Sequence, residues 1–384
     1  MYTYDKLLNT QSIMAVIRLG LNIEKPSDVN CSFSWSEQKN ILEFGKKQSI
    51  LPIVFRGLQR INSNSIVLNE YETDRLRCMH QYVNCYKELS NICTALNSSN
   101  IQYVILKGSR IGCLYPYNEF RTSSDIDILV RERQLEDAVL VIENKTDLKF
   151  LKKSYHDISF VNNLVHLELH FNLKENIEQI DRMLEKAWEY AVIASDGMGY
   201  EFTTEFNVFY IIAHMYYHFL NGGLGVRPFV DLWYIRNKTI FDENKVLHMC
   251  DACGIKKFYQ ECSFLPEVWF DERKHSKTSE MLEIVAIHGG LYGGEAFNYA
   301  VKQKSARGLK YLLNKLFPDS YHVSEFYKDP SGKKHILAYY YFKRLCSWSG
   351  KKRRKNLKKH VEGVFSVDKE QICFAKELLE RLDI

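Results

Sequence analysis

The sequence predicts an α+β protein, in which a small mixed sheet is flanked by N-terminal helices and a larger, mostly helical C-terminal region. Apolar residues recur at helical spacing before residue 98 and again after residue 176. Between these regions, short apolar runs alternate with polar residues, as they do in strands. With 384 residues, 46% of them hydrophobic, the chain is long enough to bury a large core in two or three domains.

Residues 1–98 form the predicted N-terminal helical region. Its clearest helix covers about residues 68–97 and ends at the turn-forming run Asn97-Ser-Ser-Asn100. The apolar positions of this helix return every three or four residues, which predicts an amphipathic helix. They are Leu76, Met79, Val83, Tyr86, Leu89, Ile92 and Leu96.

Residues 99–175 form the predicted α/β core. Short apolar runs predict its strands, and a helical pattern predicts one helix after the second strand. Tyr115-Pro116 ends a turn or short helix that begins at Arg110. The strands are expected at 101–106, 126–130 and 165–171, with one or two more within 148–160, and the helix at 131–143.

Residues 176–384 form the predicted helical C-terminal domain. Apolar residues at helical spacing mark its helices, and no repeat or low-complexity linker interrupts them. The glycine-rich run Gly222-Gly-Leu-Gly225 predicts a loop. The expected helices are 206–219, 228–235, 245–253, 279–287, 307–316, 334–345 and 367–382.

Composition narrows the function classes. A net charge of +5 permits an anionic substrate without requiring nucleic acid as a partner. No apolar run is long enough to span a bilayer, and the first residues lack a secretory signal pattern. We therefore expect a cytoplasmic protein, whose ten cysteines are reduced and buried rather than paired.

Two aspartates on one predicted strand are the first sign of chemistry. Alternation along a strand directs Asp125 and Asp127 to the same face. Two such carboxylates repel each other unless a cation lies between them, and hard oxygen ligands suit Mg²⁺. The turn Lys107-Gly-Ser109 precedes them, and such turns bind phosphate. The combination predicts a phosphoryl-transfer site.

A third carboxylate completes the predicted site. Two metal ions that act together in phosphoryl transfer need a cluster of carboxylates, and Glu168 lies on a later strand. Gly108 permits close approach of the backbone to a phosphate, and Ser109 adds a hydroxyl and an N–H. Lys107 and Arg121 are candidates to balance the charge of a triphosphate.

The pattern resembles the DNA polymerase β-like nucleotidyltransferase superfamily, and within it the bacterial group called uncharacterised nucleotidyltransferases. Glu168 stands where Asp is common, and the gap from Gly108 to Asp125 is longer than in minimal superfamily members but fits the group. The matching pieces are Leu106-Lys-Gly108, Leu114-Tyr-Pro116, Arg121, Asp125-Ile-Asp-Ile-Leu-Val130, Leu167-Glu-Leu-His170, His214, His218, Arg227 and Asp231-Leu232.

The resemblance implies transfer of a nucleoside monophosphate from an NTP such as ATP, with Mg²⁺ or Mn²⁺, to an acceptor hydroxyl that it does not identify. The expected catalytic and metal-binding residues are Asp125, Asp127 and Glu168. The expected nucleotide-binding residues are Lys107, Gly108, Ser109, Arg121 and Arg227, and the supporting residues are His170, His218 and Asp231.

Several side chains have two interpretations. His166, Glu168 and His170 share a strand face, which fits a transition-metal site, although His170 orienting Glu168 is the favoured interpretation. His214 and His218 are one helical turn apart, as in a zinc pair, yet no third ligand is evident and cleft residues are favoured.

Arg227 and Asp231 are spaced for a helix-start ion pair, but Arg227 is also placed to reach the nucleotide. Cys250-x-x-Cys253 lacks a second pair at zinc spacing, so structural cysteines are favoured.

Three functions stay open at this stage. The first is nucleotidyl transfer to a small molecule, sugar, peptide or protein. The second is the same transfer to RNA or tRNA, for which the basic run 351–359 is the relevant feature, although such runs are usually solvated helix faces. The third is a non-catalytic nucleotide-binding or interaction protein, against which the intact acidic pair argues.

Overall fold

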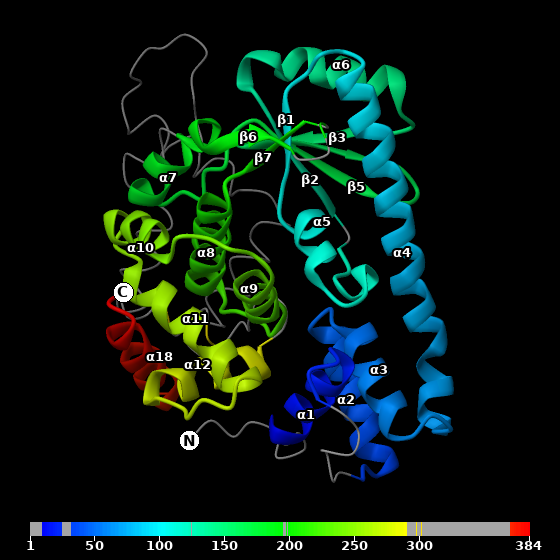
Figure 1. Cartoon of the computed structure of the whole chain (residues 1–384), viewed down its shortest axis with the longest axis vertical. Helices are drawn as coiled ribbons and strands as arrows, with labels where there is room; N and C mark the ends of the chain where they lie inside the picture. The colour runs from blue at the N-terminus through cyan, green and yellow to red at the C-terminus, as the bar shows by residue number, and fades with distance from the viewer. Residues whose placement is uncertain are drawn as a thin grey trace, which may run out of the picture.

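The fold is α+β, as predicted, with one mixed sheet at one end of the molecule and the N-terminal and last C-terminal helices at the other (Figure 1). It is seen in a computed structural model, and every structural statement below concerns the residues that this structure describes. These are residues 10–24, 32–123, 125–194, 197, 199–289, 297, 301 and 369–384.

The sheet has seven strands in the order β3-β4-β5-β2-β1-β7-β6 within the described ranges. The β2/β5 and β1/β7 pairs are parallel, and the other neighbours are antiparallel. This confirms the predicted mixed sheet. The strands are β1 Tyr103–Ile105, β2 Asp125–Val130, β3 Lys149–Lys153, β4 Asp157–Val161, β5 His166–His170, β6 Ala191–Ile193 and β7 Tyr200–Phe202.

The first five strands fall where the sequence predicts strands, whereas β6 and β7 were not predicted. Each of these two has only three residues; β1 is as short, but it lies within the longer run 101–106 that predicts a strand. β7 joins the sheet through Tyr200, which pairs with Val104 of β1. The sheet thus takes two strands from beyond residue 175, and the domain boundaries 1–98, 99–175 and 176–384 stay predictions.

The N-terminal helices pack closely because glycines face backbone atoms. A Cβ on Gly57 of α3 would lie 2.0 Å from the carbonyl oxygen of Val16 on α1. Helix α2 begins with a capping box, in which the side chains of Ser34 and Glu37 each accept a hydrogen bond from the other residue's backbone N–H. The helices are α1 Thr10–Gly20, α2 Trp35–Lys47, α3 Leu51–Ile61 and α4 Ile66–Asn97.

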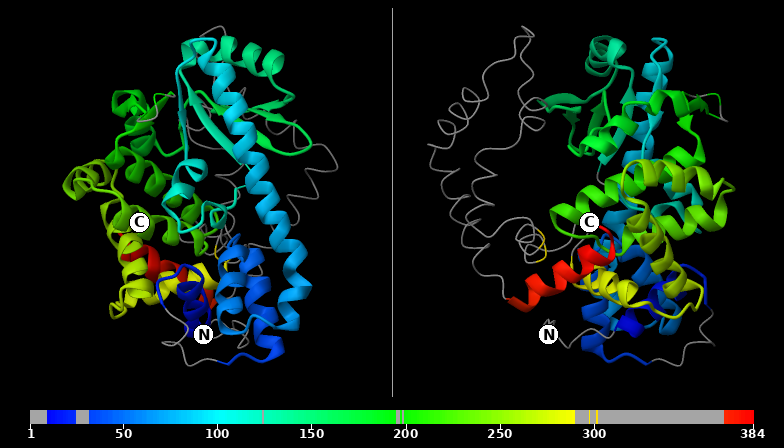
Figure 2. Two further views of the ribbon diagram at one scale, coloured as in Figure 1. Left: turned by 45° about the vertical axis from the view of Figure 1, so that its right-hand side comes forward. Right: turned by 90° about the vertical axis from the view of Figure 1, so that its left-hand side faces the viewer.

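Helix α4 is longer than the predicted helix 68–97 by two residues and connects two hydrophobic cores (Figures 1 and 2). Its start packs in the larger core through Leu68, and its end packs in the smaller core through Ile92. The middle of the predicted apolar stripe is exposed, at 50% for Leu76, 58% for Val83 and 66% for Tyr86. The amphipathic prediction is wrong there because neither core reaches the centre of the helix.

The smaller core lies on one face of the sheet, against α4 and α6 Leu135–Lys145. Most apolar residues of β2 and β5 point into it, including Ile126, Ile128 and Leu167, whereas Leu129 belongs to the larger core. Because strand residues alternate, the polar residues of both strands lie on the opposite face. The turn after β1 is the short helix α5 Gly108–Ile111, followed by a 3-10 turn, as predicted.

The larger core joins the N-terminal helices to the C-terminal ones. The predictions 206–219, 228–235, 245–253 and 279–287 are confirmed, and the last helix is confirmed over 369–381 and packs against α12 (Figure 2). The predictions 307–316 and 334–345 and the basic run 351–359 lie outside the described residues. The helices are α7 Glu178–Leu184, α8 Thr204–Asn221, α9 Arg227–Lys238, α10 Glu243–Ala252, α11 Lys256–Phe270, α12 Lys277–His288 and α18 Lys369–Arg381.

Two expectations drawn from the composition can be compared with the structure. The cysteines in the described part form no disulfide, and most are at least half-buried, but Cys113 and Cys373 are exposed, contrary to expectation. None of the described helices combines the length and apolar character that crossing a membrane requires.

Candidate active site

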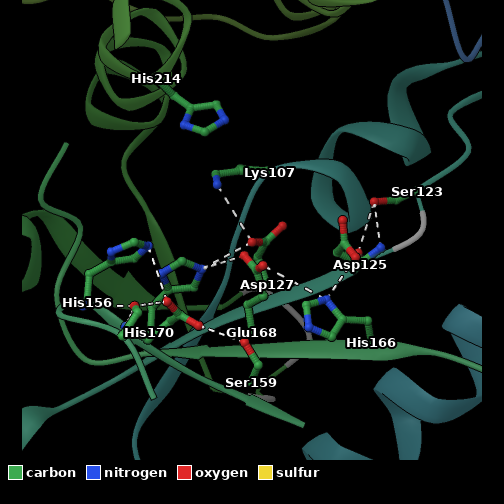
Figure 3. Close-up of polar contacts among 12 residues, drawn as sticks. Lys107, Ser123, Asp125, Asp127, His156, Ser159, His166, Glu168, His170 and His214 are labelled. Atoms are coloured by element: carbon green, nitrogen blue, oxygen red, sulfur yellow. Dashed lines mark hydrogen bonds and ion pairs between the residues drawn. The ribbon is translucent and has the colours of Figure 1, made fainter. Parts of the chain in front are cut away.

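The register of two parallel strands brings two of the three predicted carboxylates, Asp127 and Glu168, together, whereas Asp125 is not part of this group. In the β2/β5 pair, Asp125 lies opposite His166, and Asp127 lies opposite Glu168. Figure 3 shows these side chains on one face of the sheet, with His170 beside them. Glu168 is therefore adjacent to Asp127, although the two are far apart in the sequence.

Asp127, Glu168 and His170 form a cluster suited to a divalent cation. Each offers one ligand atom, and the three atoms lie within 4.8 Å of one another. His170 Nε2 is 3.1 Å from Asp127 Oδ1 and 3.6 Å from Glu168 Oε2. The two carboxylates are hard oxygen donors of the kind that fit Mg²⁺ or Mn²⁺. No other group of three such side chains was found among the described residues.

Asp127 is ionised because cations surround it. Burial alone would raise its pKa, but Lys107 and the hydrogen bond from His170 outweigh burial and lower the pKa well below its usual value. Lys107 Nζ lies 3.6 Å from Asp127 Oδ1. The pKa of His170 is raised: burial opposes the charged form, but the hydrogen bonds to Asp127 and Glu168 favour it. The favoured interpretation of His170, as a residue that orients carboxylates, agrees with these contacts.

Asp125 has a more open environment than Asp127. Its side chain is 37% exposed, against 11% for Asp127. His166 Nδ1 lies 2.9 Å from Asp125 Oδ1 and 3.9 Å from Glu168 Oε1, so His166 lies between these two carboxylates. The hydroxyl of Ser123 donates to the backbone oxygen of Asp125 at 2.9 Å and supports the start of β2.

The turn before α5 has a strained backbone at a residue that faces the cluster. Lys107 has a φ of 43°, a value that few residues other than glycine adopt. Gly108 follows, and a Cβ there would lie 2.8 Å from Nη1 of Arg121, so the position favours glycine. Ser109 lies in the first turn of α5, half-buried, and does not line the main pocket described below.

Arg121 forms a buried ion pair with Asp231 of α9. Its Nε lies 2.8 Å from Asp231 Oδ1, which also accepts a hydrogen bond from the hydroxyl of Tyr115 at 2.7 Å. Burial would lower the pKa of Arg121, but Asp231 outweighs burial and raises it. Arg121 therefore ties the core of the sheet to the C-terminal helices and presents Nη1 toward Gly108.

Arg227 begins α9 and contacts the backbone near β2. Its Nη1 donates to the carbonyl oxygen of Thr122 at 3.1 Å. The sequence suggested an ion pair between Asp231 and Arg227. In the structure, Asp231 pairs with Arg121, which lies 110 residues away in the chain. A role of Arg227 toward the nucleotide stays a prediction.

A pocket of about 620 Å³ opens beside the carboxylates. This volume is within the range of roughly 300–1,000 Å³ typical of ligand sites. One wall comes from α4 with Cys78 and Gln81, and the opposite wall from α8 with Ile211 and Met215. The predicted site residues that line it are Lys107, Gly108, Arg121, Asp125, Asp127, Glu168, His218, Arg227 and Asp231.

His214 and His218 bond each other instead of forming a zinc site. Their Nε2 atoms are 2.9 Å apart, and His214 Nδ1 lies 2.7 Å from Oε1 of Glu175. Burial lowers the pKa of both histidines, to about 3 for His218. The described residues provide no third ligand for this pair. Sequence reasoning missed Glu175, because its partner lies 39 residues further along the chain.

One comparison with known proteins gives a match. A family model described as uncharacterised nucleotidyltransferase matches residues 35–271, which is more than half of the chain. The matched segment runs from the first residue of α2 to just beyond α11 and so contains every residue of the candidate site. No curated protein and no solved structure matches the chain.

Proposed function

Because the chain belongs to the family of uncharacterised nucleotidyltransferases, we propose that it moves a nucleoside monophosphate from an NTP to an acceptor hydroxyl. The observation that carries this proposal is the β2/β5 register, which sets Asp127 opposite Glu168 on the wall of a pocket of about 620 Å³. The turn at Gly108, which we assign to the phosphates of the NTP, lines the same pocket.

The cluster provides the ligands that a divalent cation needs. Asp127 and Glu168 would hold Mg²⁺ or Mn²⁺, with His170 against both and Asp125 on the open side. A bound cation would neutralise charge on the phosphates of the donor. A carboxyl group binds a metal ion in its ionised form. The lowered pKa of Asp127 keeps it ionised at neutral pH and so supports this assignment.

The other residues have roles in the transfer itself. The acceptor oxygen forms a bond to the α-phosphorus as the bond to the departing pyrophosphate breaks, and Glu168 accepts the proton of the hydroxyl. Lys107 remains charged, because its pKa is raised: burial opposes the charge, and Asp127 outweighs burial. Lys107 and Arg227 offset the charge of the triphosphate, and Gly108 lets the backbone approach its β- and γ-phosphates.

Replacement of Asp127 tests the proposal. The full chain is incubated with each NTP labelled at the α-phosphate, with Mg²⁺ or Mn²⁺, and with a cell lysate as the acceptor pool. Asp127→Asn should lower transfer on the order of 10²–10³-fold, as loss of one transition-state contact does. Asp137→Asn, the same change at an exposed position of α6, should leave transfer unchanged.

Transfer retained by Asp127→Asn, in a protein with an unchanged circular dichroism spectrum, would contradict the proposal. Binding of Mg²⁺ and NTP by the wild type, measured by calorimetry, without label in any lysate fraction would instead favour a non-catalytic nucleotide-binding protein.

A further inference from the structure

A second cavity, of about 180 Å³, adjoins the main pocket. Lys107, Glu168 and His214 line both, so the two cavities meet at the carboxylate cluster. The second cavity is smaller than the roughly 300–1,000 Å³ of sites for drug-sized ligands. It therefore suits a single ring or a short chain, whereas the main pocket has room for a nucleotide. We call it the acceptor chamber.

The walls of the acceptor chamber are largely aromatic. Tyr155, Tyr210 and Tyr217 line it, together with His156 and His170. The rings of His156 and His170 stack with centroids 5.5 Å apart, and Tyr155 packs edge-on against His156 at 4.3 Å. Aromatic side chains of this kind combine flat apolar faces with polar edges. They suit a ligand that has both C–H faces and hydroxyl groups.

The charges in the acceptor chamber already have partners. Lys107 is paired with Asp127, and Lys174 Nζ lies 3.0 Å from an oxygen of Glu185. Glu175 Oε1 is hydrogen-bonded to Nδ1 of His214 at 2.7 Å; burial raises the pKa of Glu175 and lowers that of His214, so this contact joins a carboxyl group to a neutral imidazole. An ionic ligand would have to displace one of these pairs and lose its own hydration. A neutral polar ligand has neither cost. The charge balance therefore favours an uncharged acceptor.

We propose that the acceptor chamber binds a small, neutral, polyhydroxylated molecule, a sugar or a polyol, and presents one of its hydroxyls to Glu168. This inference rests on the proposed function and names the class of its acceptor. The hydroxyl oxygen bonds to the α-phosphorus of the NTP, the proton passes to Glu168, and pyrophosphate leaves. RNA and protein chains are disfavoured because the chamber accommodates only a fragment of either.

Two adjacent tyrosines on α8 provide the test. Tyr217 lines the acceptor chamber, whereas Tyr216 packs against Phe258 and lines neither cavity. The full chain receives Mg²⁺, α-labelled NTP and equal panels of neutral monosaccharides and alditols, sugar phosphates, amino acids, and RNA. We expect label in the neutral panel. Tyr217→Phe should raise the KM for the labelled sugar or polyol about 3- to 10-fold, as one lost hydrogen bond does.

Tyr216→Phe should leave that KM unchanged, and neither variant should alter the affinity for Mg²⁺ and NTP measured by calorimetry. Label confined to sugar phosphates, amino acids, RNA or protein would overturn the inference and leave the proposed function intact. So would an acceptor KM that is equal in Tyr217→Phe and the wild type. Absence of NTP binding and of all transfer by the wild type would overturn the proposed function, and this inference with it.

Discussion

The charge of Asp127 depends on its surroundings. Its side chain is 11% exposed, and its carboxylate is held by Lys107 and His170. A buried carboxylate without such partners would be protonated or destabilising. Asp127 thus forms a stabilising ion pair with Lys107 and also offers a carboxylate oxygen to a cation.

The lowered pKa of Asp127 predicts a pH-dependent stability difference. A carboxyl whose pKa is lower in the folded chain stabilises the fold above the unfolded pKa, here 3.8, and loses this contribution as pH falls below it. The free energy of unfolding of the wild type, minus that of Asp127→Asn, should therefore fall between pH 5 and pH 2. Urea unfolding at unit pH intervals measures it. A difference that stays constant over this range would contradict the assigned ion pair.

At the scale of single residues, the sequence predicted the carboxylates and placed Lys107 and His170 in the same site, but it did not predict the long-range partners of His214 and Asp231. Asp125 and Asp127 share a strand, so their common face follows from alternation alone. The contact between Glu175 and His214 depends on how α8 packs over the sheet, and no local pattern indicates it. The partner of Asp231 was likewise not predictable, because Arg121 reaches it from 110 residues away.

Among the elements, helix-to-helix contact in the N-terminal region depends on glycine. A Cβ on Gly57 of α3 would meet the backbone of Val16 first, whereas a Cβ on Gly45 of α2 would meet a side-chain methyl of Val54 first and the backbone of Leu51 only at 3.2 Å. A side chain can move aside, but a backbone carbonyl moves only with its helix. The two glycines therefore differ in what they tolerate, although both lie within helices.

Gly57→Ala should destabilise the chain by about 1–3 kcal/mol, the usual cost of overpacking. Helix propensity acts in the opposite direction, since alanine in a helix is favoured over glycine by about 1 kcal/mol. Gly45→Ala, the matched variant, should cost less. Urea unfolding gives both values. A stabilised Gly57→Ala variant would show that α1 and α3 do not approach as closely as described.

The elements differ in how well the sequence predicts them. Long or strongly alternating segments such as α4, β2 and β5 have clear patterns, and their bounds agree with the structure within a few residues. The strands β6 and β7, of three residues each, lie outside the segments whose patterns predict strands. The β2/β5 register, which assembles the site, depends on tertiary packing and has no signature in either strand alone.

In the molecule as a whole, one buried ion pair joins the sheet to the C-terminal helices. Arg121 precedes β2, Asp231 belongs to α9, and Tyr115 shares the same carboxylate. All three side chains are at most 8% exposed. The position of α9 against the turn at Gly108, and with it one side of the main pocket, depends on this contact.

Asp231→Asn should lower the free energy of unfolding by about 3–5 kcal/mol, because it leaves the guanidinium of Arg121 buried without a countercharge. Tyr115→Phe removes one hydrogen bond to the same carboxylate and should cost only about 1 kcal/mol. Chemical unfolding of the two variants compares them directly. Equal, small losses would show that the ion pair does not hold the two regions together.

Helix α4 has a mechanical consequence for the pocket. Its 32 residues extend about 48 Å without a break, and its two ends are anchored in different cores. A continuous helix bends sharply only at proline, at an insertion or where its hydrogen bonds are interrupted. Helix α4 is therefore a rigid element along one wall of the main pocket. We expect the pocket to open for a ligand by movement of α8 and α9 rather than by bending of α4.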